Sequence, residues 1–202
     1  GSAYLANTGA MLFGKWIPNK TGMSVIIIDG GRNYSDGYRI LGDGKSWNGL
    51  IGGGIVSGIL FIMAHKLWNK NNVEAPFVDP LIYADSSDWF WLFDGDLGSI
   101  SAAFIMGFIL GVACMVGDLF GSFIKRRRGL KREGDESSEA PLLDTIPFAI
   151  AIFITSFLLF DGQIITHPNL VEEIIFLLVV TPLIHRSFNI LGYKFGLKEV
   201  PY

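Results

Sequence analysis

The sequence predicts an all-α integral membrane protein with about five transmembrane helices, organised as a single polytopic domain over residues 1–202. Half of the 202 residues are hydrophobic and only 17% are charged. The mean hydropathy is +0.41. The apolar residues gather into segments close to the length of a membrane span, and short polar loops separate them. This is the balance of a membrane protein rather than of a soluble domain.

The first span is predicted over about 3–17, after residues 1–2, which lack a methionine and resemble a remnant of expression. This segment is short for a transmembrane helix, so it is either a truncated span or a re-entrant segment. Asn7 lies in its middle, where a buried amide needs a hydrogen-bond partner.

Four further spans are predicted over about 48–68, 98–124, 145–165 and 170–190. Two of them carry pairs of glycines four residues apart, which let helix backbones approach closely in a membrane. These pairs are Gly49/Gly53, Gly54/Gly58, Gly107/Gly111 and Gly117/Gly121.

The orientation follows from the Lys and Arg residues of the loops, which concentrate on the cytoplasmic side. There are five between Lys15 and Lys45, six in Lys125–Arg132 and three from Arg186 onward, but one in Asn69–Asp96 and none in 161–169. These counts alternate from loop to loop. We therefore expect the N-terminus outside, and the C-terminus and the two basic loops in the cytoplasm.

The predicted span 98–124 contains one ionisable residue, Asp118, which lies near the membrane edge at the end that carries a basic cluster. At about 100° per residue, Asp118, Ser122, Lys125 and Arg126 share one face of a helix, whereas Arg127 and Arg128 turn away. Contact with lipid headgroups explains Arg127 and Arg128. It does not explain Asp118, because an intramembrane carboxylate is costly and by default functional.

A glycine-rich polar segment between the first two spans carries Asp43 and Lys45. Its glycines allow backbone N–H groups to approach an anion. The triplet Gly44-Lys45-Ser46 is not a P-loop, because Arg39 stands where that motif requires glycine and no βαβ pattern precedes it.

The predicted orientation places three carboxylates, Asp43, Asp118 and Asp144, at the same membrane edge as the basic residues. Mg²⁺ prefers one or two carboxylates together with phosphate oxygens, and Lys and Arg neutralise the remaining charge. This pattern favours phosphoryl-type chemistry on a nucleotide. The membrane location indicates that the second substrate is a lipid.

Several short motifs resemble those of CDP-diacylglycerol synthases. Ser122-x-x-Lys125-Arg126 followed by Asp144-x-x-Pro147 is similar to a shortened form of that family's signature, without its glycine-histidine-glycine-glycine ending. The wider pattern resembles the archaeal CDP-archaeol synthase branch. The matching pieces are Ala6-Asn7, Asp36-Gly-Tyr-Arg39, Gly42-Asp-Gly-Lys45, Gly117-Asp118-Leu-x-x-Ser122-x-x-Lys-Arg126, Pro141-Leu-Leu-Asp144, His185-x-x-x-Asn189 and Gly196-Leu-Lys198-x-Val-Pro.

The resemblance implies Mg²⁺-dependent transfer of CMP from CTP to a geranylgeranyl ether lipid phosphate, giving CDP-archaeol and pyrophosphate. Under this hypothesis Asp118 and Asp144 hold the metal. Lys125 and Arg126 stabilise the triphosphate and the leaving pyrophosphate. The other candidates complete the phosphate shell or position substrate: Asp43, Lys45, Arg39, Ser122 and Asn7.

Two other classes of protein remain as alternatives. A CDP-alcohol phosphotransferase would need an Asp-Gly-x-x-Ala-Arg run, of which Asp36-Gly-Tyr-Arg39 matches only the opening. An ion channel or transporter is the non-enzymatic alternative, although the chain shows no internal repeat. Nucleic acid is not an expected partner, because the basic run Lys125–Arg132 occupies so short a membrane loop.

Overall fold

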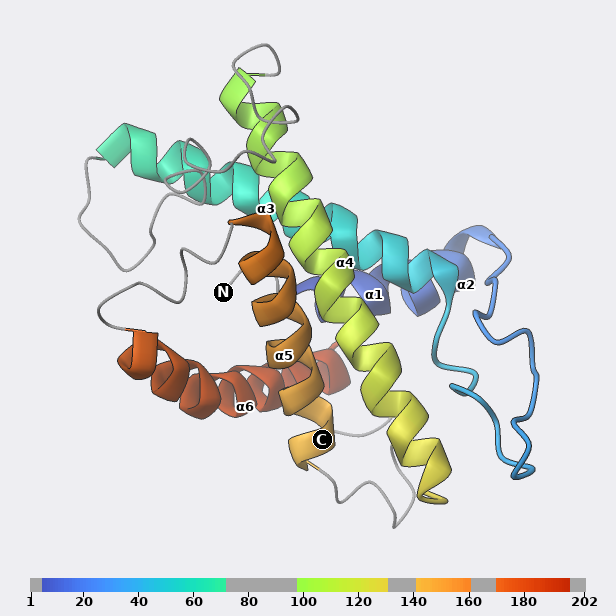
Figure 1. Cartoon of the computed structure of the whole chain (residues 1–202). Coiled ribbons are helices and arrows are strands. Elements are labelled where there is room, and N and C mark those ends of the chain that lie inside the picture. Colours follow the sequence, from blue (N-terminus) through green and yellow to red (C-terminus); the bar gives the residue numbers. More distant parts are fainter. Residues whose placement is uncertain (1–4, 72–97, 131–140, 161–169, 197–202) are drawn as a thin grey trace.

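The computed structural model describes residues 5–71, 98–130, 141–160 and 170–196 (Figure 1). Within these ranges every named element is helical, and β-pairing is limited to the isolated bridges Ile27–Ser46 and Asn33–Arg39. The all-α prediction is thus confirmed for the described residues. The elements are α1 (Ala6–Met11), the π-helical η2 (Leu12–Trp16), α2 (Ile17–Thr21), α3 (Trp47–Asn71), α4 (Gly98–Arg127), α5 (Pro141–Leu159) and α6 (Leu170–Lys194).

Two described helices are long and apolar enough to cross a membrane. They are Trp47–Leu67 in α3 and Ile100–Arg127 in α4, with hydropathies of 1.7 and 2.3. Their bounds agree with the predicted spans to within three residues. A shorter apolar helix, Ile146–Leu159, lies in α5.

The fourth span, predicted over about 145–165, falls on a helix that begins earlier. α5 runs from Pro141 to Leu159, and its apolar part, Ile146–Leu159, begins within one residue of the predicted start. Proline is favoured at the first position of a helix, because the N–H it lacks would have no intrahelical partner there. The rest of the predicted span, apart from Phe160, lies outside the described residues.

The N-terminal segment is helical further than predicted. α1, η2 and α2 follow one another without a break from Ala6 to Thr21, where the prediction ended at residue 17. Gly22 ends the run in a left-handed conformation (φ 72°), and its N–H donates to the Pro18 carbonyl oxygen over 2.9 Å. This segment packs mainly against α3.

The glycine pairs lie where helix backbones meet, as predicted. On α3, a Cβ at Gly49 would lie 3.2 Å from the Ala10 carbonyl oxygen of α1, and one at Gly54 2.8 Å from Val112 of α4. On α4, a Cβ at Gly121 would lie 2.6 Å from the Leu143 carbonyl oxygen of α5. Small residues thus allow α3 to lie between α1 and α4, and α4 to lie between α3 and α5.

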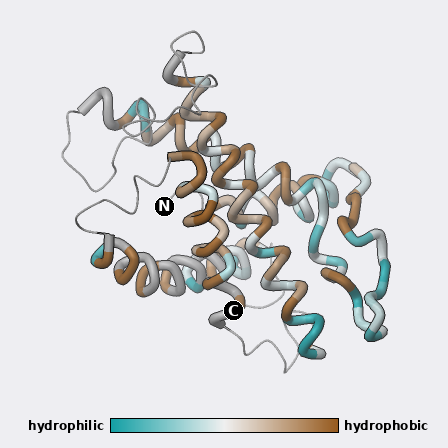
Figure 2. The backbone as a smooth tube through the Cα atoms, viewed as in Figure 1, coloured by the Kyte–Doolittle hydropathy of each residue, from teal (hydrophilic) through white to brown (hydrophobic). Residues whose placement is uncertain are grey.

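Polar residues gather at one end of this helix assembly. In Figure 2 the helices are mainly hydrophobic, and hydrophilic residues mark the end of α4 and the loop before α3. We call residues 22–46 the Gly-rich loop. Its apolar residues Met23, Val25 and Ile26 are exposed. α6 lies across one end of α5 (Figure 1).

Candidate functional site

An ion pair between Lys45 and Asp118 joins the Gly-rich loop to the C-terminal third of α4. The side chains are 24% and 19% exposed, so each is mostly removed from solvent. The two residues are 73 positions apart in sequence. The predicted convergence of the loop with Asp118 therefore exists as a direct contact.

Lys45 is held in place by backbone pairing and by the start of α3. The Ile28 N–H donates to the Lys45 carbonyl oxygen and the Trp47 N–H to that of Ile26, each over 2.9 Å. The next residue, Ser46, caps α3, because its Oγ accepts the Gly49 N–H over 3.1 Å. Lys45 thus stands directly before a helix N-terminus, where the helix dipole favours anions.

The basic end of α4 has a defined geometry of its own. Gly129 adopts a left-handed conformation (φ 69°), its N–H donates to Arg126, and the Leu130 N–H donates to Lys125 over 3.0 Å. This is a Schellman ending, which satisfies carbonyl groups left open by the last turn. The Arg126 guanidinium also reaches the Gly-rich loop, since a Cβ at Gly42 would lie 3.6 Å from its Nε.

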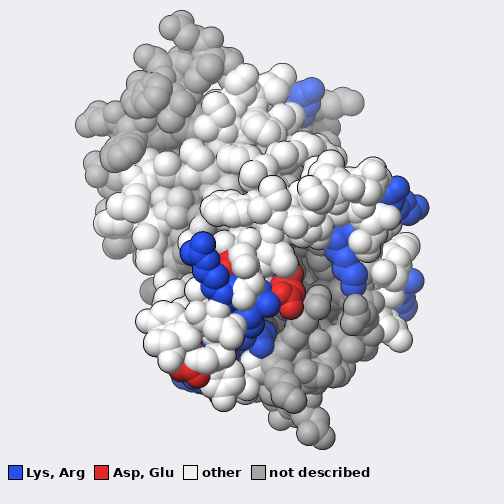
Figure 3. All heavy atoms as spheres, turned by 90° about the vertical axis from the view of Figure 1, so that its right-hand side faces the viewer, with Lys and Arg blue, Asp and Glu red and all other residues white. Residues whose placement is uncertain are grey.

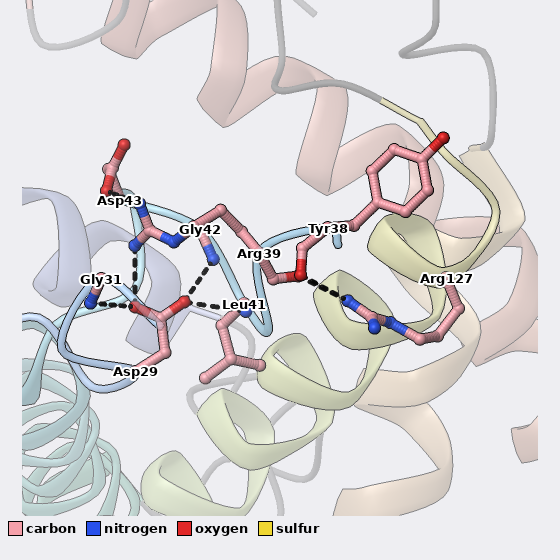
Figure 4. A network of polar contacts seen from close by, with 8 residues as sticks. All are labelled: Asp29, Gly31, Tyr38, Arg39, Leu41, Gly42, Asp43 and Arg127. Carbon is pink, nitrogen blue, oxygen red and sulfur yellow. Dashed lines mark hydrogen bonds and ion pairs between the residues drawn. The ribbon is translucent and has the colours of Figure 1, made fainter. Parts of the chain in front are cut away.

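A buried carboxylate, Asp29, organises the turn that leads to Lys45 (Figure 4). Its side chain is 1% exposed and pairs with the Arg39 guanidinium over 2.8 Å. It also accepts the N–H groups of Gly31, Leu41 and Gly42 over 3.0 to 3.1 Å. The Asp29 carboxylate therefore holds Gly31, at the beginning of the central part of the loop, close to Leu41 and Gly42 at its end.

The same network occupies Arg39. One of its guanidinium nitrogens contacts Asp29 and the other contacts Asp43 over 2.6 Å. The Asp43 side chain remains 62% exposed. The structure thus places Arg39, which the sequence suggested for substrate binding, in contacts within the protein.

Burial raises the pKa of Asp29, but the hydrogen bonds from Arg39 and the three backbone N–H groups outweigh burial and hold it well below its usual range. A carboxylate with a folded-state pKa below its unfolded value of about 3.9 contributes its full stability above that pH. The contribution is lost only as the pH falls toward the lower, folded-state pKa.

We expect Asp29→Asn to loosen the Gly-rich loop at every pH above about 4, because the amide carries no charge for Arg39 and must turn an NH₂ toward donors. The expected cost is about 1.5–3 kcal/mol of local stability. Amide hydrogen exchange of residues 29–45 measures it. Equal exchange rates in the variant and the unmodified protein at pH 7 would contradict this assignment.

The environment of Arg127 differs from the predicted one. We expected it to turn toward lipid headgroups, whereas its side chain is 19% exposed and pairs with Asp36 of the Gly-rich loop over 2.6 Å. It also donates to the carbonyl oxygens of Arg39 (2.6 Å) and Tyr38 (3.4 Å). The reason is that the loop folds over the end of α4 and offers an anion and carbonyl groups on the side that faces away from Asp118.

The other predicted site residues lie on the elements around this contact. Ser122 is buried one turn beyond Asp118, and Lys125 lies in the last turn of α4. Asn7 is partly exposed in the first turn of α1. Asp144 belongs to α5, but its side chain lies outside the described part of the structure. Its backbone follows Leu143, whose carbonyl oxygen faces Gly121 of α4.

On the face shown in Figure 3, acidic and basic side chains lie together in one group near the centre, and further Lys and Arg side chains lie apart from it. Among the described residues, no three His, Cys, Asp or Glu side chains come together as metal ligands. In the described part of the chain, the Asp side chains of this region instead pair with Lys and Arg side chains. Asp29 is the acidic residue that the sequence analysis missed, and the signal that could have found it is a single acid between an isoleucine run and Gly-Gly. Asp36 was named there only as part of a family motif, without a role.

Two protein families match the chain. Residues 91–202 match the CarS-like family, described as CDP-archaeol synthase. Residues 43–138 match the Cytidylyltransferase family. The second range contains both Lys45 and Asp118.

Individual relatives match along the whole length. A CDP-archaeol synthase of Methanospirillum hungatei is 35% identical over 200 residues, which cover 99% of this chain and 98% of the relative. One from Pyrococcus horikoshii is 37% identical over 200 residues, covering 99% of this chain and 91% of the relative.

One solved structure shares the fold. It is described as an intramembrane enzyme for archaeal membrane lipids biosynthesis, and it matches with a TM-score of 0.57 at 21% identity. The match covers 94% of this chain and 91% of the other. The overall helical fold of this chain is thus shared with that enzyme.

Proposed function

The chain belongs to the CDP-archaeol synthase family and is a CTP-dependent nucleotidyltransferase, and from this premise we propose that the Lys45–Asp118 contact marks its catalytic site. The reaction is transfer of CMP from CTP to a geranylgeranyl ether lipid phosphate, giving CDP-archaeol and pyrophosphate. The single observation that supports this site best is the ion pair itself. It joins a cation beside a helix N-terminus to a carboxylate in an apolar helix.

The transfer step needs no general base. A phosphate monoester is already ionised near neutral pH, so its oxygen can attack the α-phosphorus of CTP directly. As the new P–O bond forms, the bond from the α-phosphorus to the bridging oxygen breaks, and its electron pair leaves with pyrophosphate. Positioning and electrostatic stabilisation then supply most of the reduction of the barrier.

The basic residues provide that stabilisation. Lys45 lies directly before α3, where its ammonium and the positive end of the helix dipole would both favour an anion. Lys125 and Arg126 would neutralise charge on the triphosphate from the end of α4. Asp43, with a largely exposed side chain beside Arg39, is placed to complete the polar shell. Ser122 and Asn7 are candidates for positioning substrate.

The donor set fits a magnesium ion that arrives with the nucleotide. Asp118 offers one carboxylate, and Asp144 belongs to the α5 turn that packs against α4 beside Gly121. Mg²⁺ prefers one or two carboxylates together with phosphate oxygens, so a complete protein cage is not needed. Bound there, the ion would offset charge on the phosphates as the leaving group departs.

We also propose that this site lies at the cytoplasmic membrane edge of a protein with five spans. The support is the alternation of Lys and Arg counts among the loops. CTP is a cytoplasmic nucleotide, which agrees with this sidedness. Labelling of single cysteines introduced at positions 43 and 165, with Cys114 replaced, would test it from each side of sealed vesicles.

The reaction is tested with CTP labelled in either its α- or its γ-phosphate, supplied with Mg²⁺ and the geranylgeranyl ether lipid phosphate to purified protein in detergent. We expect the α-label in the lipid fraction and the γ-label in pyrophosphate. An α-label that is found in water-soluble CMP would indicate hydrolysis of CTP instead. Absence of any lipid-soluble label would contradict the proposed reaction.

We expect Lys45→Ala to lower kcat/KM for CTP about 100-fold, because it removes a cation from a mostly water-excluded site. Lys45→Arg should retain part of the rate, since it restores charge with a different geometry. Steady-state kinetics at varied CTP concentration measure both variants. Lys20→Ala, which removes an exposed lysine of α2, is the matched control and should stay near the original rate.

A further inference from the structure

We infer that Arg127 is a positioning residue that holds the Gly-rich loop against the end of α4 so that Lys45 meets Asp118. The inference rests on the proposed function of the Lys45–Asp118 contact. Arg127 does not touch either of these residues in any contact that the structure shows. Arg127 would therefore affect the position of Lys45 through the conformation of the Gly-rich loop.

The Arg127 guanidinium has hydrogen-bond acceptors at two of its three nitrogens and two aromatic rings beside it. Its edge nitrogens contact the Asp36 carboxylate and the carbonyl oxygens of Tyr38 and Arg39. The Tyr34 ring lies 4.5 Å from its central carbon, and the Phe123 ring lies 5.1 Å away. These two rings meet edge to face at 5.8 Å. One side chain thus joins four residues of the loop to α4.

Figure 4 shows how this contact continues toward the site. The Arg39 carbonyl oxygen accepts a hydrogen bond from Arg127, while the Arg39 guanidinium pairs with Asp29 and Asp43. Asp29 in turn fixes the N–H groups of Leu41 and Gly42. The Gly42 carbonyl oxygen accepts the Lys45 N–H over 3.2 Å. A connected set of contacts therefore runs from Arg127 to Lys45.

The contacts between the loop and α4 are spread over about half of the helix circumference. At about 100° per residue, Arg127 stands roughly 180° around the helix from Asp118 and roughly 13 Å further along its axis. Arg126, at about 80°, lies beside Gly42 between these two points. Two contacts on opposite sides of a helix define the position of a loop far better than one contact does.

Arginine suits this position for a physical reason. Its planar fork can donate to a carboxylate and to carbonyl groups at once, and its faces can stack on aromatic rings. A lysine keeps the charge but offers neither the fork nor the plane. The neighbouring Arg128 is exposed, and the structure shows no side-chain contact from it to the Gly-rich loop. Arg128 is thus a matched control with the same charge at the next position.

The first test measures the local stability of the Gly-rich loop in the absence of substrate. Amide hydrogen exchange of residues 29–46 is compared between the unmodified protein, Arg127→Gln and Arg128→Gln. We expect exchange to accelerate about tenfold to 100-fold in Arg127→Gln only, since a hydrogen-bonded charged group is lost. Should Arg127→Gln fail to fold, Asp36→Asn removes the same ion pair from the loop side and is expected to accelerate exchange in the same residues. Unchanged exchange in the folded variant, or in Asp36→Asn, overturns the inference.

The second test measures coupling between Arg127 and Lys45, which a general loss of stability would not produce. kcat/KM for CTP is measured for Lys45→Ala, Arg127→Gln and the double variant. We expect Lys45→Ala to cost about 100-fold in the unmodified background and tenfold or less in Arg127→Gln, where Lys45 is already displaced. Arg127→Lys should restore only part of the coupling. Multiplicative effects of the two changes would overturn the positioning role.

The two tests separate failure of this inference from failure of the proposed function. Absence of transfer in the unmodified protein would contradict the proposed function, whereas the exchange experiment would still decide whether Arg127 holds the loop. Faster exchange in Arg127→Gln with a full Lys45 effect would overturn the role of Arg127 in positioning and leave the proposed reaction intact.

Discussion

Asp118→Asn is expected to abolish cytidylyl transfer, with a fall in kcat of about 10³-fold or more, while the protein stays folded. The amide has nearly the same size as the carboxylate, so packing in α4 is preserved. The lost quantity is the negative charge that pairs with Lys45 and that a metal ion would require. Loss of one preorganised charged group at a reacting phosphate accounts for an effect of this size.

Folding of this variant is checked by its thermal midpoint and elution volume in detergent. Lys45 is 24% exposed and keeps access to water, so the variant does not leave a fully buried cation. Glu172→Gln, at an exposed carboxylate of α6, is the matched control and should transfer CMP at the original rate. A folded Asp118→Asn protein with kcat within tenfold of the original would remove Asp118 from the catalytic role.

Gly121→Leu is expected to disrupt the packing of α4 against α5 and to lower both the folded yield and the thermal midpoint. A Cβ at this position would lie 2.6 Å from the Leu143 carbonyl oxygen, and a backbone atom cannot move aside as a flexible side chain can. Even one added methyl group in such a contact costs about 1–3 kcal/mol, and leucine adds three more carbons.

The same change should reduce transfer in the fraction that folds, because separation of α5 from α4 carries the Asp144 backbone away from Asp118. Val116→Leu, at an exposed position of the same helix, is the control for added volume and should have little effect. A Gly121→Leu protein with the original thermal midpoint would show that α4 and α5 do not pack as closely as described.

Much of the architecture could be predicted, because a membrane imposes strong constraints on sequence. The two long apolar helices were located from composition and length, and the glycine pairs indicated which faces would meet. The meeting of Lys45 with Asp118 followed from the Lys and Arg pattern, which placed the Gly-rich loop and the end of α4 at one membrane edge.

The conformation of the Gly-rich loop could not be predicted from the sequence in the same way. Arg127 was assigned to the wrong environment because a helical wheel shows only which side of α4 a residue occupies. It cannot show that a loop folds around to that side and brings Asp36 with it. Asp29 was missed because its role comes from three backbone N–H groups, and backbone direction in a glycine-rich segment has no simple sequence signature.

The most direct test of the central claim is the binding of Mn²⁺ in the presence of CTP, measured by electron paramagnetic resonance without lipid. If nucleotide and metal bind where Lys45 meets Asp118, the unmodified protein binds Mn²⁺ in a CTP-dependent way, and folded Asp118→Asn loses that binding. Equal CTP-dependent Mn²⁺ binding by both proteins would contradict the claim and place the nucleotide site elsewhere.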